Sequence, residues 1–592
     1  MEKLDIIIVT YNSSRWVTAC LNSILAADYM NSDISVTFVD NGSQDQTVDI
    51  IENYPDKEQF GGYQCVQLQK NCGFGSANNY GVKCTVNPYI LLLNADTELY
   101  KDALLELKRA VIQSESVTAM WEMRQVPYEH PKWYNPVSLE TTWCSAAACL
   151  VRREVFEECE GFDESIFMYA EDVDLSWRFR QRGYKLQYVP TSVVKHYSYS
   201  SPGIVKPLQQ YSSIVNNLRL RFKFGRLKDI AEGYVWYLAA IIFIRPKGYV
   251  MSLIAQLLKS FGWSRKYRMR RTGSNFSAPF EPVFNRFEYE LAREGAFYTS
   301  KPIAGEAPLI SILVRTTERP EVLREALLSI RNQTYPSLEV VVVEDGMNAS
   351  EWMINKDFAD LNITYRCTSG KSGRTRAANL ALQHARGAYF CFLDDDDLLF
   401  AEHIEVLYNE IIASGKRAAY SLAYEAYTEV ESTSPEYCYE IKDRRIVYRE
   451  NFNRRVLLYR NFFPIQTVLF SRSLYDELGG MDESFEYLED WDLWLRYAAS
   501  HEFVYVDKAT SVYKVPYQNR EYSSRKILLQ AAHQKILDKH RDILKEIPSV
   551  ELEEGEKRIK AISTVRYKLK NKSFKQIVGL MLDRAKQSFR TK

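Results

Sequence analysis

The stretches FCFLDDDDLL (Phe390–Leu399) and ILLLNADTEL (Ile90–Leu99) each lead from an apolar run into acid, at matching places in the two halves of this 592-residue chain. Two other apolar runs with polar or acidic ends precede each stretch, and a Glu-Asp pair follows it. The preceding runs are DIIIVTYNSS (Asp5–Ser14), TFVDNGS (Thr37–Ser43), SILVRTTERP (Ser311–Pro320) and VVVEDG (Val341–Gly346), and the pairs lie in YAEDVDLSWRF (Tyr169–Phe179) and YLEDWDLWLRY (Tyr487–Tyr497). An ordered acidic set that occurs twice indicates two copies of one domain.

The apolar runs predict buried strands, and the residues after them predict helices. The runs III, LLL and VVV do not alternate with polar residues, as expected for strands covered on both faces. Strands that alternate with amphipathic helices indicate an α/β fold with a mainly parallel sheet. Ligands of such sheets bind beyond the carboxyl ends of the strands. The acids of each half should therefore lie on one rim.

The length predicts several domains, because a single core rarely serves more than about 250–300 residues. The expected order is a first α/β domain over residues 1–204, a helical connector over 205–305, a second α/β domain over 306–520 and a helical, basic tail over 521–592.

The composition is that of an ordinary soluble globular protein, with 46% hydrophobic and 26% charged residues. The balance of 76 basic and 76 acidic residues argues against a dedicated nucleic-acid binder. Ten cysteines without a CxxC motif fit a reducing compartment. A charged residue directly after Met1 predicts no secretory signal. We therefore expect a cytoplasmic protein.

One segment has two interpretations with respect to a membrane. Tyr234–Ile244 is apolar but falls well short of the ~20 residues of a spanning helix. Basic clusters flank it at Arg219–Lys228 and Arg265–Arg271, and Lys557–Lys592 is again basic and apolar. These segments are either core or solvated helices, or an interfacial surface on the anionic inner face of the cytoplasmic membrane.

The acidic run Asp394–Asp397 suggests a cation site. Adjacent carboxylates repel each other by roughly 1 kcal/mol per close pair in water, and by more where water is excluded. A hard cation such as Mg²⁺ or Mn²⁺ would offset the repulsion and could grip a diphosphate. The alternative is a solvated acidic loop.

The pairs Glu171-Asp172 and Glu489-Asp490 each open an amphipathic helix. Acids at a helix N-terminus are favoured by the helix dipole, which is a purely structural explanation. An ionised carboxylate can instead act as a general base on a hydroxyl group. The lead-ins GFDESIFMYAED (Gly161–Asp172) and GMDESFEYLED (Gly480–Asp490) are nearly identical, which favours the functional explanation.

Both halves resemble family 2 glycosyltransferases of the GT-A fold, inverting enzymes that use nucleotide-activated sugars. The first half is similar to the rhamnosyltransferase-like branch, and the second to the general branch. The motifs that carry the resemblance are VTYNS, VDNGS, NCGFGSANN (Asn71–Asn79), LLNAD, GFDE and YAEDVDLSWR in the first half, and RTTERP, VEDG, SGRTRAAN (Ser372–Asn379), FLDDDD and LEDWDLWLR in the second.

The resemblance implies a role for each residue of the repeated set. Asp172 and Asp490 would be the catalytic bases, and Asp96, His196 and Asp396 would hold Mn²⁺ or Mg²⁺. The nucleotide-sugar contacts would be Thr10, Asp40, Asn94, Thr316, Glu344, Asp345, Asp394 and Asp395. A lone histidine is often structural, so His196 has that alternative. Two departures are Asn94, where a full DxD motif has Asp, and SVYKVPYQNR (Ser511–Arg520), which has no histidine.

The implied function is a bifunctional, metal-dependent, inverting hexosyltransferase. It would transfer sugars from UDP-, dTDP- or GDP-sugars to a growing bacterial surface polysaccharide, with a glycan or a lipid-linked oligosaccharide as acceptor. The alternative is one active domain with a glycan-binding or scaffolding partner. A sugar nucleotidyltransferase ranks last, because VTYNSSRW lacks a glycine-rich, basic triphosphate loop.

Overall fold

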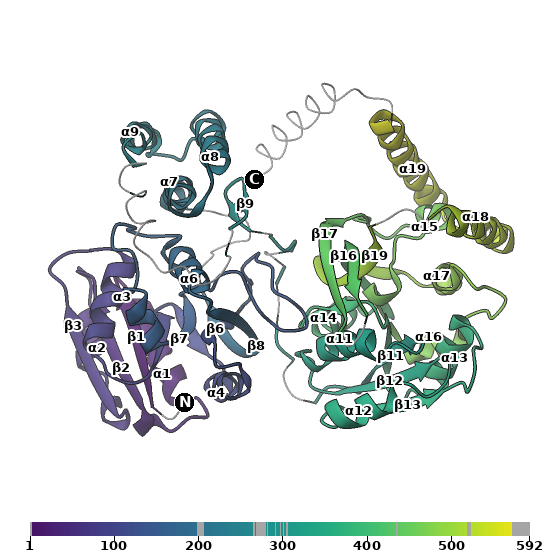
Figure 1. The fold of residues 1–592 in the computed structure, drawn as a ribbon, viewed down its shortest axis with the longest axis horizontal. Coiled ribbons are helices and arrows are strands. Elements are labelled where there is room, and N and C mark those ends of the chain that lie inside the picture. The colour runs from purple at the N-terminus through teal and green to yellow at the C-terminus, as the bar shows by residue number, and fades with distance from the viewer. Residues whose placement is uncertain are drawn as a thin grey trace. The chain divides into compact units, whose positions relative to one another are not determined.

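The computed structural model describes residues 3–197, 206–263, 267, 280, 282–290, 292–295, 298–299, 301–303, 306–433, 436–517 and 522–570. The chain forms two compact units, called unit 1 (Met1–Ser300) and unit 2 (Lys301–Asp583). Each unit contains one large sheet with helices packed on it (Figure 1). Of the predicted basic segments, most of Arg265–Arg271 and the end of Lys557–Lys592 lie outside the described residues.

Unit 1 contains an eight-stranded sheet in the order β3-β2-β1-β4-β7-β6-β8-β5. The strands β3, β2, β1 and β4 are parallel, while β7 runs antiparallel between β4 and β6. The strands are β1 (Leu4–Thr10), β2 (Ile34–Asp40), β3 (Gly62–Gln67), β4 (Tyr89–Asn94), β5 (Thr97–Leu99), β6 (Thr118–Val126), β7 (Ala148–Arg152) and β8 (Lys185–His196). The helices are α1 (Ser14–Leu25), α2 (Thr47–Glu52), α3 (Phe74–Lys83), α4 (Ala103–Gln113), α5 (Arg153–Glu158) and α6 (Glu171–Gln181).

Unit 2 repeats this path in the order β13-β12-β11-β14-β18-β16-β19-β15, with β17 added beside β16. The strands are β11 (Ile310–Thr316), β12 (Leu338–Glu344), β13 (Ile363–Cys367), β14 (Tyr389–Asp394), β15 (Leu398–Leu399), β16 (Ala418–Ser432), β17 (Cys438–Ile446), β18 (Val468–Ser471) and β19 (Phe503–Pro516). The helices are α11 (Pro320–Arg331), α12 (Glu351–Asp357), α13 (Arg374–His384), α14 (His403–Ser414), α15 (Arg454–Tyr459), α16 (Arg472–Leu478) and α17 (Glu489–Ser500). The predicted pair of α/β domains with mainly parallel sheets is confirmed.

Both faces of the central strands are buried, as the unbroken apolar runs predict. In unit 1, Ile6 and Ile8 of β1 pack with α1, α2 and α4, while Ile7 packs with α3, α5 and α6. Burial of each such side chain contributes about 1.5–3 kcal/mol. Because helices cover both faces of the sheet, its polar side chains can gather at the carboxyl ends of the strands.

Helices follow the sheet in each unit. In unit 1 these are α7 (Pro207–Phe224), α8 (Leu227–Ala239), the π-helix η3 (Ala240–Ile244) and α9 (Val250–Ser260); in unit 2 they are α18 (Tyr522–Lys539), the 3₁₀ helix η5 (Arg541–Lys545) and α19 (Ser549–Lys570). No helix within the described ranges combines the length and the apolar character needed to cross a bilayer. Ile536 of α18 and Ile559 of α19 belong to the core of unit 2.

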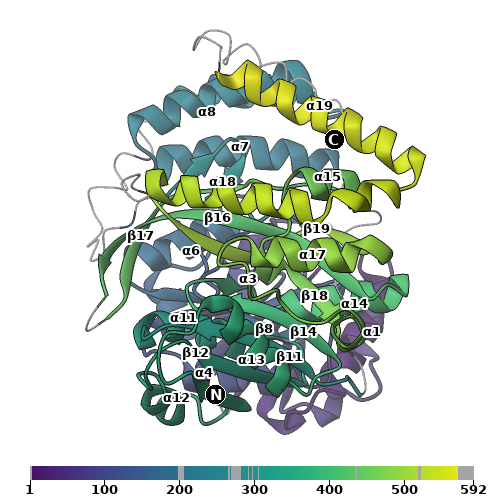
Figure 2. The same cartoon turned by 90° about the vertical axis from the view of Figure 1, so that its right-hand side faces the viewer.

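The repeat continues into these following helices. Lys223 of α7 and Lys539 of α18 occupy the same place, and each pairs with two aspartates around the Glu-Asp helix. The aspartates are Asp163, at 2.8 Å, and Asp174 in unit 1, and Asp482 and Asp492, at 2.7 Å each, in unit 2. Figure 2 shows α18 alongside α17. In each unit, these ion pairs therefore hold one long helix beside the helix that the Glu-Asp pair begins.

Candidate active sites

The strand register brings the predicted residues of unit 2 to one rim. Thr316 at the end of β11 lies beside Glu344 of β12, and Arg315 lies beside Asp394 of β14. In unit 1, Thr10 lies beside Asp40 in the same way, and its hydroxyl donates to Asp40 Oδ1 at 3.0 Å. In both units, the residues at the ends of corresponding neighbouring strands therefore lie together.

Two arginines connect the acidic run of unit 2 to its Glu-Asp pair. Arg315 donates to Asp394 Oδ1 from Nε and to Glu489 Oε1 from Nη1, both at 2.8 Å. Arg374, the first residue of α13, lies 3.1 Å from each of the same carboxylates. Burial opposes ionisation of Asp394, but the charges of Arg315 and Arg374 outweigh it and hold the pKa of Asp394 below its usual value. We call these four residues the arginine frame.

The next two aspartates differ in their surroundings. Asp395 is buried and accepts from Thr316 Oγ1 at 2.7 Å and from Arg319. Burial raises the pKa of Asp395 to about 6, against the opposing charge of Arg319. Asp396 is 37% exposed and lies 3.7 Å from Arg319. Burial and the charge of Asp394 raise the pKa of Asp396.

The predicted acids at the end of the second strand hold loops. Glu344 accepts from the backbone N–H groups of Ala349 and Ser350, each at 3.1 Å. Asp345 accepts from the N–H groups of Ser372, at 2.6 Å, and Gly373, at 3.1 Å. In unit 1, a similar bond joins Asp40 Oδ2 to the N–H of Ser43, at 2.9 Å. These carboxylates fix the loops that border each rim.

Asp490 has the surroundings of a general base. Its Oδ2 accepts from Asn461 Nδ2 at 2.9 Å. Burial, and then the charge of Glu489, raises the pKa of Asp490 to about 7. Leu488, directly before the pair, has a left-handed backbone with φ of 61°, which is uncommon for leucine. Ala170 has φ of 72° at the same position of unit 1. Strained backbone of this kind is often found at functional sites.

Asp172 occupies the corresponding position in unit 1. It accepts from its neighbour's N–H, Val173, at 2.8 Å and from Ala146 N–H at 3.4 Å. Burial raises the pKa of Asp172 above its usual value. Its partners are thus backbone groups, where Asp490 has an amide side chain.

The structure brings Asp96 and His196 together. His196 Nε2 lies 3.4 Å from Asp96 Oδ1, and Gln125 Oε1 holds the other ring nitrogen at 2.7 Å. Burial opposes ionisation of Asp96, but the hydrogen bond and charge of His196 outweigh it and lower its pKa. A carboxylate and an oriented imidazole suit Mn²⁺, and the accessible, crowded Asp396 suits a hard cation. Across the described residues, three or more His, Cys, Asp or Glu side chains do not cluster in a metal-binding arrangement.

Among its described residues, unit 1 lacks the two arginines of the arginine frame. Val9 and Asn94, which pair in register, stand where unit 2 has Arg315 and Asp394. Phe74 is the first residue of α3, where Arg374 is the first residue of α13. One carboxylate oxygen of Glu171 is buried without a hydrogen-bond partner in the described parts of the chain. Burial raises the pKa of Glu171 well above its usual value. The positions of both arginines are thus taken in unit 1 by the uncharged side chains of Val9 and Phe74.

The two arginines of the frame were not predicted from the sequence. A comparison of the two halves could have found them. RTTERP has Arg315 where VTYNS has Val9, and SGRTRAAN has Arg374 where NCGFGSANN has Phe74. The contacts span 174 positions from Arg315 to Glu489, and sequence spacing does not indicate such pairs.

The pKa of Asp490 predicts the pH dependence of unit 2. If Asp490 acts as the base that the resemblance implies, it must be ionised, so turnover should rise roughly tenfold per pH unit below about pH 7 and then level off. Since the folded-state pKa exceeds the ~3.9 of a free aspartate, stability should decline as pH rises from about 4 to 7. Asn461→Ala should move the inflection of the pH–rate profile upward, because it removes a donor to the ionised form. An unmoved inflection would contradict the assignment.

The family comparison matches both units. The model described as "Glycosyl transferase family 2" matches residues 5–159 and 311–479. A second model, "Glycosyltransferase like family 2", matches residues 137–211.

Similar proteins include an uncharacterised glycosyltransferase of Rickettsia bellii, 25% identical over 425 residues, which are 68% of this chain and 54% of the relative. The N-acetylglucosaminyl-diphospho-decaprenol L-rhamnosyltransferase of Mycobacterium tuberculosis is 27% identical over 248 residues, 34% of this chain and 78% of that protein. The chain spans less than two thirds of the Rickettsia relatives' length.

Solved structures with some similarity include the mannosyltransferase PcManGT from Pyrobaculum calidifontis in complex with GDP-Man and Mn²⁺. It is 17% identical with a TM-score of 0.32, over 46% of this chain and 83% of that chain. S. aureus TarS 1–349 in complex with UDP-GlcNAc is 17% identical with a TM-score of 0.29, over 50% of this chain and 99% of that chain.

Proposed function

The chain belongs to glycosyl transferase family 2 in both of its units, and from this we propose that each unit transfers a sugar from a nucleotide-sugar donor to a growing surface polysaccharide. The observation that carries the proposal is the repeated placement of an aspartate with a raised pKa, Asp172 or Asp490, behind a strained residue at the rim. The unequal frames suggest two different donors.

The proposed reaction in unit 2 is a single displacement. Asp490 takes the proton of an acceptor hydroxyl as the oxygen attacks the anomeric carbon of the donor. The new C–O bond forms as the bond from the anomeric carbon to the diphosphate oxygen breaks, and the nucleoside diphosphate leaves with the electron pair. Attack from the opposite side inverts the anomeric configuration. Asp172 would perform the same step in unit 1.

The rim residues would bind the donor. Thr316 and the loops that Glu344 and Asp345 hold would border the nucleoside, and Thr10 and Asp40 would do so in unit 1. Asp396 would hold Mn²⁺ or Mg²⁺ in unit 2, as would Asp96 with His196 in unit 1; a bound cation supplies positive charge against the leaving diphosphate. The remaining contacts proposed for the donor come from Asn94, Asp394 and Asp395.

Released nucleoside diphosphate tests this proposal. The full chain is incubated with a panel of UDP-, dTDP- and GDP-sugars, with Mn²⁺ or Mg²⁺, and Asp96→Ala and Asp396→Ala are assayed separately. Each variant should lose the release that depends on one donor and keep the other. If one substitution leaves all release intact, the unit that carries it has the scaffolding role. Unit 1 is the candidate for that role, because its described residues lack the two arginines of the frame.

A lipid-linked acceptor is part of the proposal. The mycobacterial rhamnosyltransferase to which this chain is similar is named for N-acetylglucosaminyl-diphospho-decaprenol, a lipid-linked sugar. In this chain, large apolar side chains are exposed on α8, η3 and α9 and at the residue after α9. The exposures of seven of them range from 48 to 77%. They are Val235, Leu238, Ile242, Phe243, Met251, Leu258 and Phe261, here called the apolar surface.

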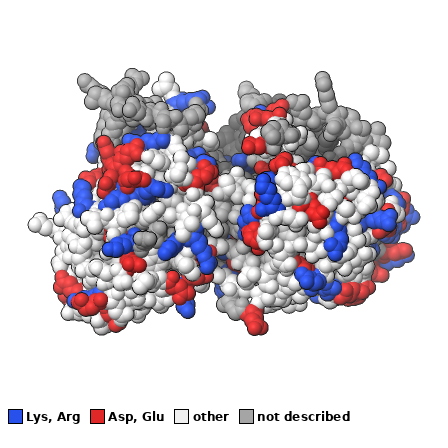
Figure 3. Space-filling model, turned by 60° about the horizontal axis from the view of Figure 1, so that its bottom comes forward, with Lys and Arg blue, Asp and Glu red and all other residues white. Residues whose placement is uncertain are grey.

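The charges around the apolar surface suit an anionic bilayer. Residues 233–263 contain Arg245, Lys247 and Lys259 but no Asp or Glu, while the first half of α8 carries Asp229 and Glu232. Elsewhere, the face in Figure 3 shows basic and acidic side chains on both units. Apolar contact and attraction of basic residues add at the surface of an anionic membrane. We therefore propose that the chain lies peripherally on such a membrane.

Flotation with vesicles tests the apolar surface. Phe243→Ser with Leu258→Ser should weaken binding to phosphatidylglycerol vesicles by about tenfold or more, because two apolar side chains no longer enter the interface. Val86→Ser with Ile112→Ser is the matched control, since both residues are exposed elsewhere in unit 1. Equal loss in the control, or equal binding to neutral vesicles in high salt, would contradict the proposal.

A further inference from the structure

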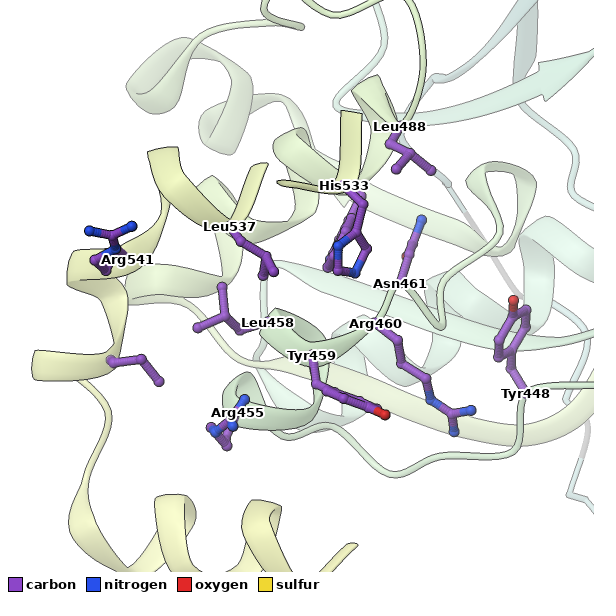
Figure 4. A pocket seen from close by; sticks show the side chains of 12 residues that line it. Tyr448, Arg455, Leu458, Tyr459, Arg460, Asn461, Leu488, His533, Leu537 and Arg541 are labelled. Atoms are coloured by element: carbon purple, nitrogen blue, oxygen red, sulfur yellow. The ribbon is translucent and has the colours of Figure 1, made fainter. Parts of the chain in front are cut away.

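A pocket of about 720 Å³ lies in unit 2 beside the start of α17. Figure 4 shows side chains reaching it from α18 on one side and from α15 and the segment after it on the other. The lining residues are Tyr448, Arg455, Leu458, Tyr459, Arg460, Asn461, Leu488, Trp491, His533, Leu537, Arg541 and Leu544. Half of them follow residue 479, where the family match ends, so the family match does not assign the pocket.

The lining combines positive charge with apolar surface. It includes three arginines, four leucines and four aromatic residues, counting the histidine, and no acidic side chain. Arg455, Arg460 and Arg541 each reach one carboxylate outside the lining, at 2.7, 3.2 and 2.7 Å. A guanidinium has five N–H donors, so each retains donors for a ligand. The buried Nε of Arg460 has no hydrogen-bond partner in the described part of the chain.

The pocket adjoins the proposed base. Asn461 lines it and donates to Asp490 Oδ2 at 2.9 Å. Leu488 and Trp491, which also line it, stand on either side of the Glu-Asp pair in the sequence. A molecule held in the pocket would therefore lie within one side chain of the group that accepts the proton.

The corresponding position in unit 1 holds a buried arginine. Counting from the shared lysines Lys223 and Lys539, Arg221 of α7 stands where Leu537 stands in α18. Arg221 is fully buried and donates to Asn217 Oδ1 at 2.9 Å. Its other nitrogens bond to backbone carbonyl groups, each at 2.8 Å. The two units thus differ at this position, which is a leucine of the pocket lining in unit 2 and a buried arginine in unit 1.

We propose that this pocket binds the acceptor of unit 2, and that the acceptor carries a phosphate ester joined to a hydrocarbon portion. The inference rests on the proposed function, since it supplies the substrate for Asp490. The arginines would bind the phosphate through charge-assisted hydrogen bonds, and the leucines and Trp491 would cover the hydrocarbon.

Three soluble probes separate the parts of this ligand. Octyl phosphate has both parts, sn-glycerol 3-phosphate has the phosphate alone, and octyl β-glucoside has the chain alone. Binding to the full chain, without donor, is followed by tryptophan fluorescence and calorimetry below the micellar concentration. Octyl phosphate should bind about tenfold or more tightly than either partial probe. Equal binding of one partial probe would overturn the proposal.

Three variants test the position of the site. Arg541→Gln, in an exposed place, should weaken octyl phosphate binding about tenfold, as should Arg460→Gln. Leu537→Trp should prevent binding by filling the pocket. Lys356→Gln removes an exposed charge of α12 as the matched control and should bind normally. Unchanged binding in Arg541→Gln and Leu537→Trp would overturn the inference, as would an absence of binding to the unmodified chain.

Binding and transfer fail independently in these experiments. If octyl phosphate binds as expected but no nucleotide sugar is turned over, the glycosyltransferase proposal fails and the pocket stands. If sugar is transferred while octyl phosphate does not bind, the pocket proposal fails alone.

Discussion

Asp490→Asn should lower sugar transfer by unit 2 about 10²–10⁴-fold, the usual contribution of a positioned general base. The amide keeps the shape of the side chain and its contact with Asn461, but it cannot accept the acceptor's proton. Donor binding should remain, because the rim residues are unchanged. The measurement is nucleoside diphosphate release with the donor of unit 2, together with donor affinity.

The control for this variant is Asp476→Asn, an exposed aspartate on α16 of the same unit. It should retain full turnover and the inflection near pH 7. If Asp490→Asn keeps more than about a tenth of the rate with the same pH profile, Asp490 is not the base.

Arg315→Val should destabilise unit 2 by about 3–5 kcal/mol, as expected when one partner of a buried ion pair is removed. Arg315 is 6% exposed and pairs with Asp394 and Glu489. Its loss leaves Arg374 as their remaining partner within the arginine frame. The free energy of unfolding should be followed by hydrogen exchange of β11 and β14, since the two units need not unfold together.

A double variant isolates the charge effect. Arg315→Val with Asp394→Asn gives unit 2 the residues that Val9 and Asn94 supply in unit 1. It should be more stable than Arg315→Val alone, because the uncompensated carboxylate is removed with its partner. A double variant that is less stable than the single one would show that packing, and not charge, sets the cost.

The sequence predicted the α/β class, the repeat and the rim. These follow from local patterns, because apolar runs specify buried strands and parallel strands bring their carboxyl ends together. The antiparallel strands β7 and β18 in the middle of each sheet were not predicted, since their pairing is decided by tertiary contacts and not by the strands' own composition.

Other parts of the site depend on contacts between distant residues. Lys223 and Lys539 lie on the helices after each sheet, and only folding brings them to the aspartates of the Glu-Asp helix. The pocket beside Asp490 likewise needs His533 and Leu537 of α18. From charge and periodicity, α18 was predicted to be part of a helical tail. Those two properties do not reveal the surface on which a helix packs.

The most direct measurement of the central claim compares the products of Asp172→Asn, Asp490→Asn and the unmodified chain, given both active donors and one acceptor. We expect two different linkages from the unmodified chain, of which each variant makes only one. If either variant still makes both linkages, or if one substitution abolishes both, the chain does not contain two independent transfer sites.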